Sequence, residues 1–283
     1  MLKRLKNEVV HSVWAMWHQM QEGDFVQTYT EKGFRGNDKE WESMCIPFGE
    51  DAKICLNGVI DRVDLCSLPG EELIKIIDYK SSDSQDLLLA KVYYGLQMQL
   101  LTYLEAAKEM VEKEHKGKEA VPAAMLYYAI KEKNLDWKPE SEEEYEKRVL
   151  DSMKCKGYVN EEPEIIGHLD KSVVNGGELI PGQKSGVVPV AVDKKGLLKK
   201  NSGTLSTKDF ETLIAHTKEK MKECGKAILD GKIEAIPYVY EDNDGCTYCP
   251  YGSVCGHESK KDGVREMKKM SDDEVWEALY GDD

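Results

Sequence analysis

Two neighbouring stretches carry the clearest pattern in this sequence: Lys53-Ile-Cys-Leu-Asn-Gly-Val-Ile-Asp-Arg-Val-Asp-Leu-Cys66 and Leu73-Ile-Lys-Ile-Ile-Asp-Tyr-Lys80. Both are rich in β-branched residues and alternate with a period of two, which predicts one long strand followed by a second strand. Pro69 and Gly70 lie between them and are typical of a turn. The two strands are therefore expected to form a β-hairpin.

The hairpin brings carboxylates and a lysine together. In the second strand, alternation puts Asp78 and Lys80 on the face that carries Ile74 and Ile76. In the first strand, Asp61 lies among apolar neighbours, where an unpaired carboxylate is costly. Two carboxylates from adjacent strands beside a lysine suit a divalent ion of the Mg²⁺ type and leave room for a phosphate. An ion pair on a solvated hairpin face explains the same residues equally well.

The segment after the hairpin adds two polar residues. A polar link at residues 81–86 leads into a predicted helix from about residue 87 to residue 113, with Gly95 in its middle. Gln99 and Tyr103 are spaced i, i+4 and therefore share one face of that helix. They are expected next to the hairpin, although a solvated helix flank is the plainer explanation.

The other expected elements surround this centre. Helices are predicted at residues 1–20, at 142–153 and, capped by Ser206, up to Gly231, and a strand is predicted at residues 121–130. A short helix is expected around Trp276. Residues 21–38 carry no clear pattern.

Two side chains near these motifs are expected to be structural. Asp64 lies three residues after Asp61, hence on the opposite strand face, beside Arg62. Cys224 falls on the apolar face of the predicted helix after Ser206, which indicates a core position.

The eight cysteines divide into two groups. Five are isolated and are expected to be buried free thiols: Cys45, Cys55, Cys66, Cys155 and Cys224. The other three form the cluster Cys246-x2-Cys249-x5-Cys255. Three thiolates within ten residues indicate a zinc site or an iron–sulfur cluster, and the spacing does not separate the two. Chance clustering of structural thiols is the alternative.

Composition restricts the function classes. The chain has 283 residues, 41% of them hydrophobic, which excludes a mainly disordered or collagen-like protein. It carries no apolar run of about 18 residues and no secretory signal, so we expect a cytoplasmic protein that does not span a membrane. A net charge of −14 predicts weak binding to DNA by this chain alone, with lysines gathered at Lys194–Lys200 and Lys260–Lys269.

Several motifs together resemble a known family. Gly58-Val-Ile-Asp61, Ile77-Asp78-Tyr79-Lys80-Ser81 and Gln99-x3-Tyr103 follow one another in the order seen in the RecB-like branch of the PD-(D/E)XK nuclease superfamily. The sequence around these motifs, together with the segment from Cys246 to Cys255, is similar to the C-terminal nuclease domain of the AddB (RexB-like) component of AddAB-type helicase–nucleases. The resemblance covers about residues 50–260.

The resemblance implies an α/β fold of the restriction-endonuclease-like type, a mixed β-sheet flanked by helices. A single nuclease domain is expected over residues 1–283, with its core at about 44–130 and helices to about 235. A Cys-rich segment at 243–258 and a charged tail at 260–283 would follow.

The implied activity is that of a metal-dependent DNA nuclease of the exonuclease type. Asp61 and Asp78 would hold Mg²⁺ or Mn²⁺, Lys80 would orient water or stabilise charge, and Gln99 with Tyr103 would support the site or contact DNA. The implied partners are DNA and the AddA-like component of a helicase–nuclease that acts in double-strand-break repair and recombination. A catalytically weak or inactive module that binds DNA or acts as a scaffold is the alternative. A zinc-binding interaction domain is a third and less favoured alternative.

The resemblance also implies a 4Fe-4S cluster held by Cys246, Cys249 and Cys255, with a fourth cysteine from far upstream. Cys45 is the nearest upstream candidate. The Gly-x3-His motif of the family has no match, because His11 and His18 lack the glycine. We therefore expect the chain to be a fragment of a larger protein, with an incomplete or absent cluster and weak nuclease activity.

Overall fold

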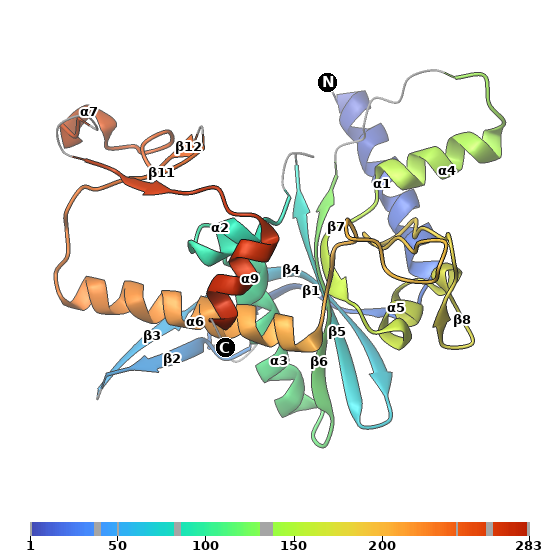
Figure 1. Ribbon diagram of the computed structural model, residues 1–283, viewed down its shortest axis with the longest axis horizontal. Coiled ribbons are helices and arrows are strands. Elements are labelled where there is room, and N and C mark those ends of the chain that lie inside the picture. Colours follow the sequence, from blue (N-terminus) through green and yellow to red (C-terminus); the bar gives the residue numbers. More distant parts are fainter. Residues whose placement is uncertain are drawn as a thin grey trace. The chain divides into compact units, whose positions relative to one another are not determined.

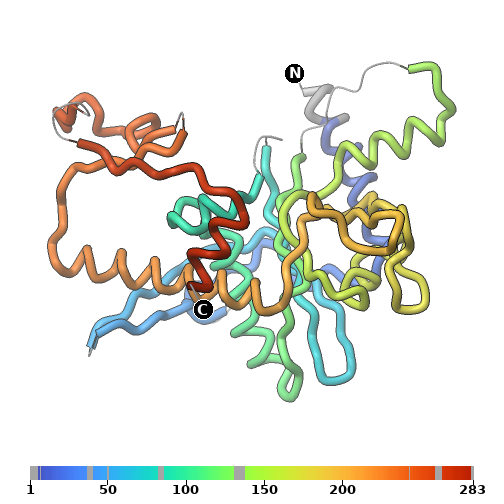
Figure 2. Tube along the Cα trace, viewed as in Figure 1, coloured from blue at the N-terminus to red at the C-terminus, as the bar shows by residue number. Residues whose placement is uncertain are grey.

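The computed structural model describes residues 2–36, 41–49, 51–81, 86–130, 138–241, 243–258 and 263–281 (Figure 2). Residues 82–85 of the expected polar link and residues 260–262 and 282–283 of the expected tail lie outside this part of the chain. The chain divides into two compact units. The first comprises residues 1–45, 55–87 and 98–214, and the second comprises residues 46–54, 88–97 and 215–283. The expectation of a single nuclease domain stays a prediction.

A six-stranded mixed sheet forms the centre of the first unit (Figure 1). Its strands, in spatial order, are β1 (Val26–Phe34), β4 (Gly58–Leu68), β5 (Glu71–Lys80), β6 (Glu119–Ala129), β7 (Lys156–Asn160) and β10 (Thr204–Leu205). The antiparallel pair β4–β5 is the predicted hairpin, and β6 confirms the strand predicted after the helix. β5 and β6 run parallel, so the sheet is mixed.

Helices pack on both faces of this sheet. α3 (Gln99–Glu114) packs against β5 and β6. A buried hydrophobic cluster, which includes Leu73 and Ile77 of β5, also takes in Ala15 from α1 (Leu2–Gln21) and Ile166 from α5 (Pro163–Leu169). Because β5 is covered on both faces, it is an almost continuous apolar run rather than a strictly alternating one. The expected α/β class is confirmed.

The remaining predicted helices are present. α4 (Glu142–Ser152) begins with a capping box at Ser141. α6 (Thr207–Leu229) begins after Ser206, whose Oγ accepts from the N–H of Asp209 at 3.0 Å while its own N–H donates to Asp209 Oδ2 at 2.9 Å. Short elements fill the region between them: η1 (Lys171–Val173), β8 (Val174–Asn175) and β9 (Glu178–Leu179).

β1 lies where the sequence carried no clear pattern. It is an edge strand with mostly exposed side chains, and its pairing with β4 shifts register between Gln27 and Tyr29. Glu31 also has a positive φ of 47°. A bulged, half-polar edge strand has no regular alternation, so its sequence gives no periodic signal.

The predicted strand at 53–66 is two strands, which corrects the expectation of one. β3 (Ala52–Leu56) ends before Asn57 and pairs with β2 (Met44–Phe48) in a separate two-stranded sheet. β4 starts at Gly58 and belongs to the six-stranded sheet. Alternation continues across Asn57, so the sequence pattern could not show that the backbone changes partners there.

The predicted helix at 87–113 is also interrupted, and Gly95 is not in a helix. α2 (Leu89–Tyr93) ends two residues before Gly95, which has a φ of +77°. The N–H of Leu96 bonds to the carbonyl of Lys91, and the N–H of Gly95 bonds to the carbonyl of Val92. This is the pattern of a Schellman motif, for which glycine is favoured. A new helix, α3, then starts at Gln99.

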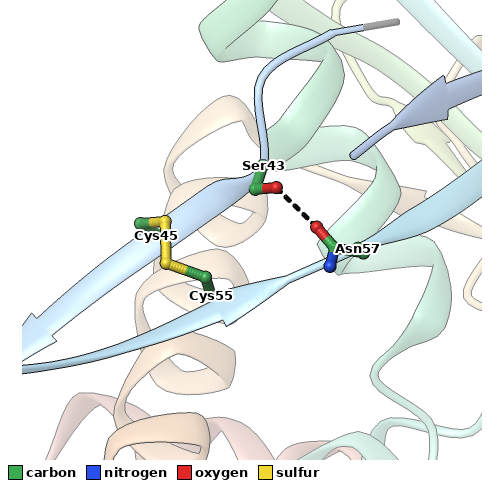
Figure 3. Close-up of a disulfide and its surroundings, with 4 residues drawn as sticks. All are labelled: Ser43, Cys45, Cys55 and Asn57. Carbon is green, nitrogen blue, oxygen red and sulfur yellow. Dashed lines mark hydrogen bonds between the residues drawn. A yellow bond between two sulfur atoms is a disulfide. The ribbon is translucent and has the colours of Figure 1, made fainter. Parts of the chain in front are cut away.

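Three of the five isolated cysteines differ from the expectation. Cys45 and Cys55 form a disulfide across the β2–β3 pair and are exposed (Figure 3). Cys224 is exposed, although the residues of its helix face up to Met221 are buried. Cys66 and Cys155 are buried free thiols, as expected. Helical spacing located the right face of α6 but not the point at which other chain segments stop covering it.

The second unit contains α2, most of α6 and a three-stranded sheet. That sheet has the order β12-β11-β13, made of β11 (Tyr238–Tyr240), β12 (Asn243–Asp244) and β13 (Arg265–Met267). α7 (Gly252–Cys255) is a single short turn, and α9 (Asp272–Tyr280) packs against α2 and confirms the helix expected around Trp276. Within the described part of the chain, no helix has the length and apolarity needed to cross a bilayer.

Candidate active site

Asp61 and Asp78 come from the antiparallel pair β4–β5. The backbone ladder of this pair extends only as far as Arg62 and Ile77. Beyond that point, the N–H of Tyr79 donates to Oδ2 of Asp61 at 2.8 Å, so a side chain replaces the backbone acceptor. The Asp61 carboxylate is thereby held against the segment that carries Asp78 and Lys80.

The Asp78 carboxylate is buried, with 2% exposure. Burial raises the pKa of this carboxyl group, Lys80 opposes the shift, and the charge of Asp61 adds to it. Oδ2 of Asp78 accepts no hydrogen bond of good geometry from the described residues. It contacts Nζ of Lys80 at 2.5 Å as an ion pair. A buried carboxylate oxygen with a lone pair to spare is costly, and a bound cation would satisfy it.

Lys80 links the strand residues to α3. Its Nζ donates to Oε1 of Gln99 at 3.2 Å, and Nε2 of Gln99 donates to the hydroxyl of Tyr103 at 2.9 Å. The i, i+4 spacing in the first turns of α3 places both side chains on the helix face beside the strand. The structure therefore brings together all five side chains that the sequence singled out, although their chemical roles stay predictions.

The plainer explanations describe part of this arrangement. An ion pair does form, between Asp78 and Lys80 of the same strand rather than across the hairpin. The Gln99 amide is partly solvated, yet both of its ends are engaged within the cluster. A simple surface pair does not require the buried, incompletely bonded carboxylate of Asp78.

Gly58 allows α3 to lie close to β4. A Cβ atom at this position would lie 2.6 Å from the Phe34 ring and 3.4 Å from the Tyr103 ring. The two rings meet edge to face with centroids 6.0 Å apart. A glycine three residues before Asp61 is therefore a packing requirement of the site, which the sequence alone did not explain.

The donor set fits a hard divalent cation. No group of three or more His, Cys, Asp and Glu side chains suited to a metal occurs in the described ranges. Mg²⁺, however, is commonly held by one or two protein carboxylates, with water and phosphate oxygens completing its coordination. The carboxylates of Asp61 and Asp78 are such a pair.

A buried ion network lies on the other face of β4. Asp64 is fully buried and accepts from Nε and Nη2 of Arg62 at 2.6 and 2.8 Å. Lys75 Nζ lies 2.9 Å from Oδ2 of the same carboxylate. Burial favours the neutral acid, but Lys75 and Arg62 outweigh it and lower the pKa of Asp64. The expected position of Asp64 beside Arg62 is confirmed, and Lys75 is a partner that the sequence did not reveal.

A family comparison agrees with this geometry. The model of the PD-(D/E)XK nuclease superfamily matches residues 1–256. The chain belongs to the PD-(D/E)XK nuclease superfamily. Its mixed sheet with flanking helices is the α/β fold expected of that family.

Similar proteins of known name are components of helicase–deoxyribonucleases. The PD-(D/E)XK chain is 32% identical over 280 residues to the B subunit of the ATP-dependent helicase/deoxyribonuclease of Thermoanaerobacter sp. (strain X514), covering 98% of this chain and 23% of the relative. The proteins of the same name from Lachnoclostridium phytofermentans and Caldanaerobacter subterraneus are 34% and 35% identical, covering 95% and 92% of this chain and 22% of each relative. The chain thus spans less than a quarter of the length of these relatives.

The cysteine cluster of this PD-(D/E)XK chain is arranged differently from the carboxylate site. Cys246, Cys249 and Cys255 are exposed free thiols, and no metal-holding group in the described residues includes them. The segment is shaped by Asp244, whose Oδ1 accepts from the N–H groups of Cys246 and Thr247 at 2.9 and 2.6 Å. Cys45 is bound to Cys55, so it is no free thiolate in this structure. The iron–sulfur or zinc assignment stays a prediction.

Proposed function

We propose that this chain is the nuclease module of a helicase–nuclease complex and that it hydrolyses phosphodiester bonds of DNA in exonuclease fashion. The proposal depends on a divalent ion, Mg²⁺ or Mn²⁺, held by Asp61 and Asp78. The observation that carries it is the buried Oδ2 of Asp78, which accepts no hydrogen bond of good geometry from the described residues and contacts the Lys80 ammonium as an ion pair. The names of the similar proteins support DNA as the substrate class.

The residues of the chain divide the chemistry between them. When bound, the metal ion would polarise the phosphate and make water a better nucleophile. Asp61 and Asp78 supply its oxygen ligands. Lys80 carries the positive charge that can orient the attacking water or stabilise the negative charge developing on phosphorus. Gln99 holds the Lys80 ammonium, and Tyr103 holds the Gln99 amide.

The charge of the chain indicates where DNA affinity arises. With a net charge of −14, this chain offers little general attraction for phosphates. We propose that a helicase partner of the AddA-like type delivers the unwound strand in the cytoplasm during double-strand-break repair and recombination. The module would then need only local contacts to the scissile phosphate.

We further propose that Cys246, Cys249 and Cys255 contribute three ligands to a 4Fe-4S cluster in the assembled protein. The support is their spacing, because three thiolates within ten residues match such ligation better than isolated structural thiols. Iron and sulfide analysis of anaerobically purified protein, with zinc measured in parallel, tests this proposal. One zinc and no iron per chain would contradict it.

The nuclease proposal is tested by DNA degradation with purified protein. Radiolabelled single-stranded DNA is incubated with Mg²⁺, with Mn²⁺ or with EDTA, using wild type, Asp78→Asn and Lys80→Met. Asp51→Asn and Lys53→Met are matched controls, because both residues are exposed and lie outside the site. Cleavage that needs metal and is lost only in the two site variants supports the proposal.

A catalytically weak or inactive module is the second candidate. The ion pair between Lys80 and Oδ2 of Asp78 favours it, because the lysine already occupies the carboxylate oxygen that a metal ion would bind. In the same assay, equal cleavage by wild type, Asp78→Asn and the EDTA control would reject catalysis at this site. Retention of DNA binding without cleavage would favour the scaffold role.

A further inference from the structure

The Lys80 ammonium has more contacts than the sequence motifs account for. An ammonium group has three N–H donors. One side of Nζ meets Oδ2 of Asp78 at 2.5 Å, and another meets Oε1 of Gln99 at 3.2 Å. The third contact is aromatic: Nζ lies 5.2 Å from the centre of the Tyr127 ring. This distance is within the range of a cation–π interaction.

The backbone places Tyr127 at this position. β5 and β6 pair in parallel, and Tyr127 stands opposite Asp78 in the register. Successive side chains of a strand point to opposite faces. Tyr128 is accordingly part of the hydrophobic cluster on the other face, where its hydroxyl donates to the carbonyl of Ser12 at 3.2 Å. Tyr127 is 6% exposed, so its buried ring lines the site.

We propose that Tyr127 is a positioning residue, whose ring face holds the Lys80 ammonium in place while Oδ2 of Asp78 binds the metal ion. The inference rests on the proposed nuclease function of the same site. A cation on Asp78 competes with Lys80 for one oxygen, because Oδ2 is both the ion-pair partner of Lys80 and the atom without a hydrogen bond in the described residues. Gln99 and the Tyr127 ring are the contacts that the lysine can keep.

The ring, and not the hydroxyl, is the functional part of Tyr127. The hydroxyl of a tyrosine with its ordinary pKa is already protonated at neutral pH, and burial, together with the charge of Asp78, raises the pKa of Tyr127 to about 12. A neutral aromatic ring attracts a cation by its face, and phenylalanine offers a comparable face. Tyr127→Phe is therefore expected to preserve the contact, and Tyr127→Leu is expected to remove it while keeping an apolar side chain.

The first test needs no enzymatic activity. In metal-free protein labelled with ¹³C at the lysine ε-carbons, the ring current of Tyr127 moves the Lys80 ε-methylene signal upfield, and Lys80→Arg assigns that signal by its loss. The shift is expected to persist in Tyr127→Phe and to disappear in Tyr127→Leu. Tyr128→Phe is the matched control and should leave the shift in place. A Lys80 signal at the ordinary lysine position in wild type, or an unchanged shift in Tyr127→Leu, would overturn the proposal.

The second test measures single-stranded DNA cleavage by folded protein at saturating Mg²⁺. Tyr127→Leu is expected to lower kcat by about 10-fold with little change in KM, because the substrate-binding contacts remain. Tyr127→Phe should restore kcat to within about twofold of wild type. Tyr128→Phe should lower the melting temperature without changing kcat. Equal losses of kcat in Tyr127→Phe and Tyr127→Leu would overturn the proposal. If the wild type cleaves nothing, the nuclease proposal fails, and the lysine signal still decides whether the ring holds Lys80.

Discussion

The carboxylate site and the cysteine segment were both predicted as metal sites from short, well-spaced motifs, yet within the described structure they differ in burial and in the elements that carry them. Asp61, Asp78 and Lys80 lie on two long strands whose register is set by a buried core, and α3 adds Gln99 from a third element. The three thiols lie on a turn and a four-residue helix, with exposed side chains. Rigid elements hold side chains more precisely than a loop does, so the same kind of motif gives a firmer structural expectation on strands and helices.

Among the predicted effects, the largest is the loss of DNA cleavage on substitution of Asp78 in the carboxylate site. Asp78→Asn keeps the shape of the side chain but removes the charge that a metal ion needs, so metal-dependent DNA cleavage should fall by about 1,000-fold, equivalent to about 4 kcal/mol. The fold should remain, because burial already disfavours the ionised form and raises its pKa. Initial cleavage rates and circular dichroism measure both effects. Cys249→Ser is the counterpart in the other region, and a loss as large in that variant would show that cleavage depends on the cysteine segment as much as on the carboxylate site.

The second prediction concerns the network behind the carboxylate site. Asp64→Asn leaves Arg62 and Lys75 buried without their shared carboxylate, and it should cost about 3–5 kcal/mol of unfolding free energy. Urea denaturation measures this loss. Glu42→Gln breaks an exposed ion pair with Lys113 and is the matched control, with an expected cost below about 1 kcal/mol.

The same network predicts a pH dependence. The pKa of Asp64 is lower in the folded protein than its ordinary value of 3.8. The stabilisation is therefore fully present above about pH 4 to 5 and is lost as the pH falls through the folded pKa. As the pH falls below about 4, the unfolding free energy of the wild type should decrease by this contribution. Asp64→Asn has no carboxyl group to protonate at this position, so it should not show this decrease. Identical acid profiles for the two proteins would contradict the assignment.

A smaller effect is expected at the glycine beside the site. Gly58→Ala would place a Cβ atom 2.6 Å from the Phe34 ring, which requires that ring to move against the Tyr103 ring of α3. We expect a loss of about 1–3 kcal/mol in unfolding free energy, together with slower cleavage, because the Tyr103 ring shares the contact. Gly186→Ala is the control, since a Cβ there meets nothing within 4 Å. Unchanged stability and rate in Gly58→Ala would mean that α3 does not depend on this close approach.

The smallest effect is predicted for the cysteine segment without metal. Cys246→Ser and Cys249→Ser alter exposed side chains, so the thermal stability of metal-free protein should change by less than about 0.5 kcal/mol. After anaerobic reconstitution with iron and sulfide, only wild type should gain visible absorption and stability. Large destabilisation of the metal-free variants would show that the thiols are packed in the protein and would remove the contrast between the two regions.

The pairs of residues whose proximity the sequence predicted most directly lie close together along the chain. Asp78 and Lys80 are two apart on one strand, and Gln99 and Tyr103 are four apart on one helix, so the geometry of a single element is sufficient. The failures depend on partners that are distant in sequence. Cys45 and Cys55 were expected to be free thiols, but the pairing of β2 with β3 brings them together as a disulfide. Cys224 was placed in the core because helical spacing does not reveal where coverage of α6 ends.

The sequence by itself determined the class of fold, the hairpin and the five side chains that lie near one another beside it, because hydrophobic periodicity and ordered motifs run along the chain. Only the tertiary structure decided that Tyr127 lies under Lys80, that Lys75 completes the Asp64 network and that Gly58 admits the Phe34 ring. The physical reason is the same in each case. Strand register and the approach of a helix to a sheet are set by the packing of the whole core, and many remote side chains contribute to that packing.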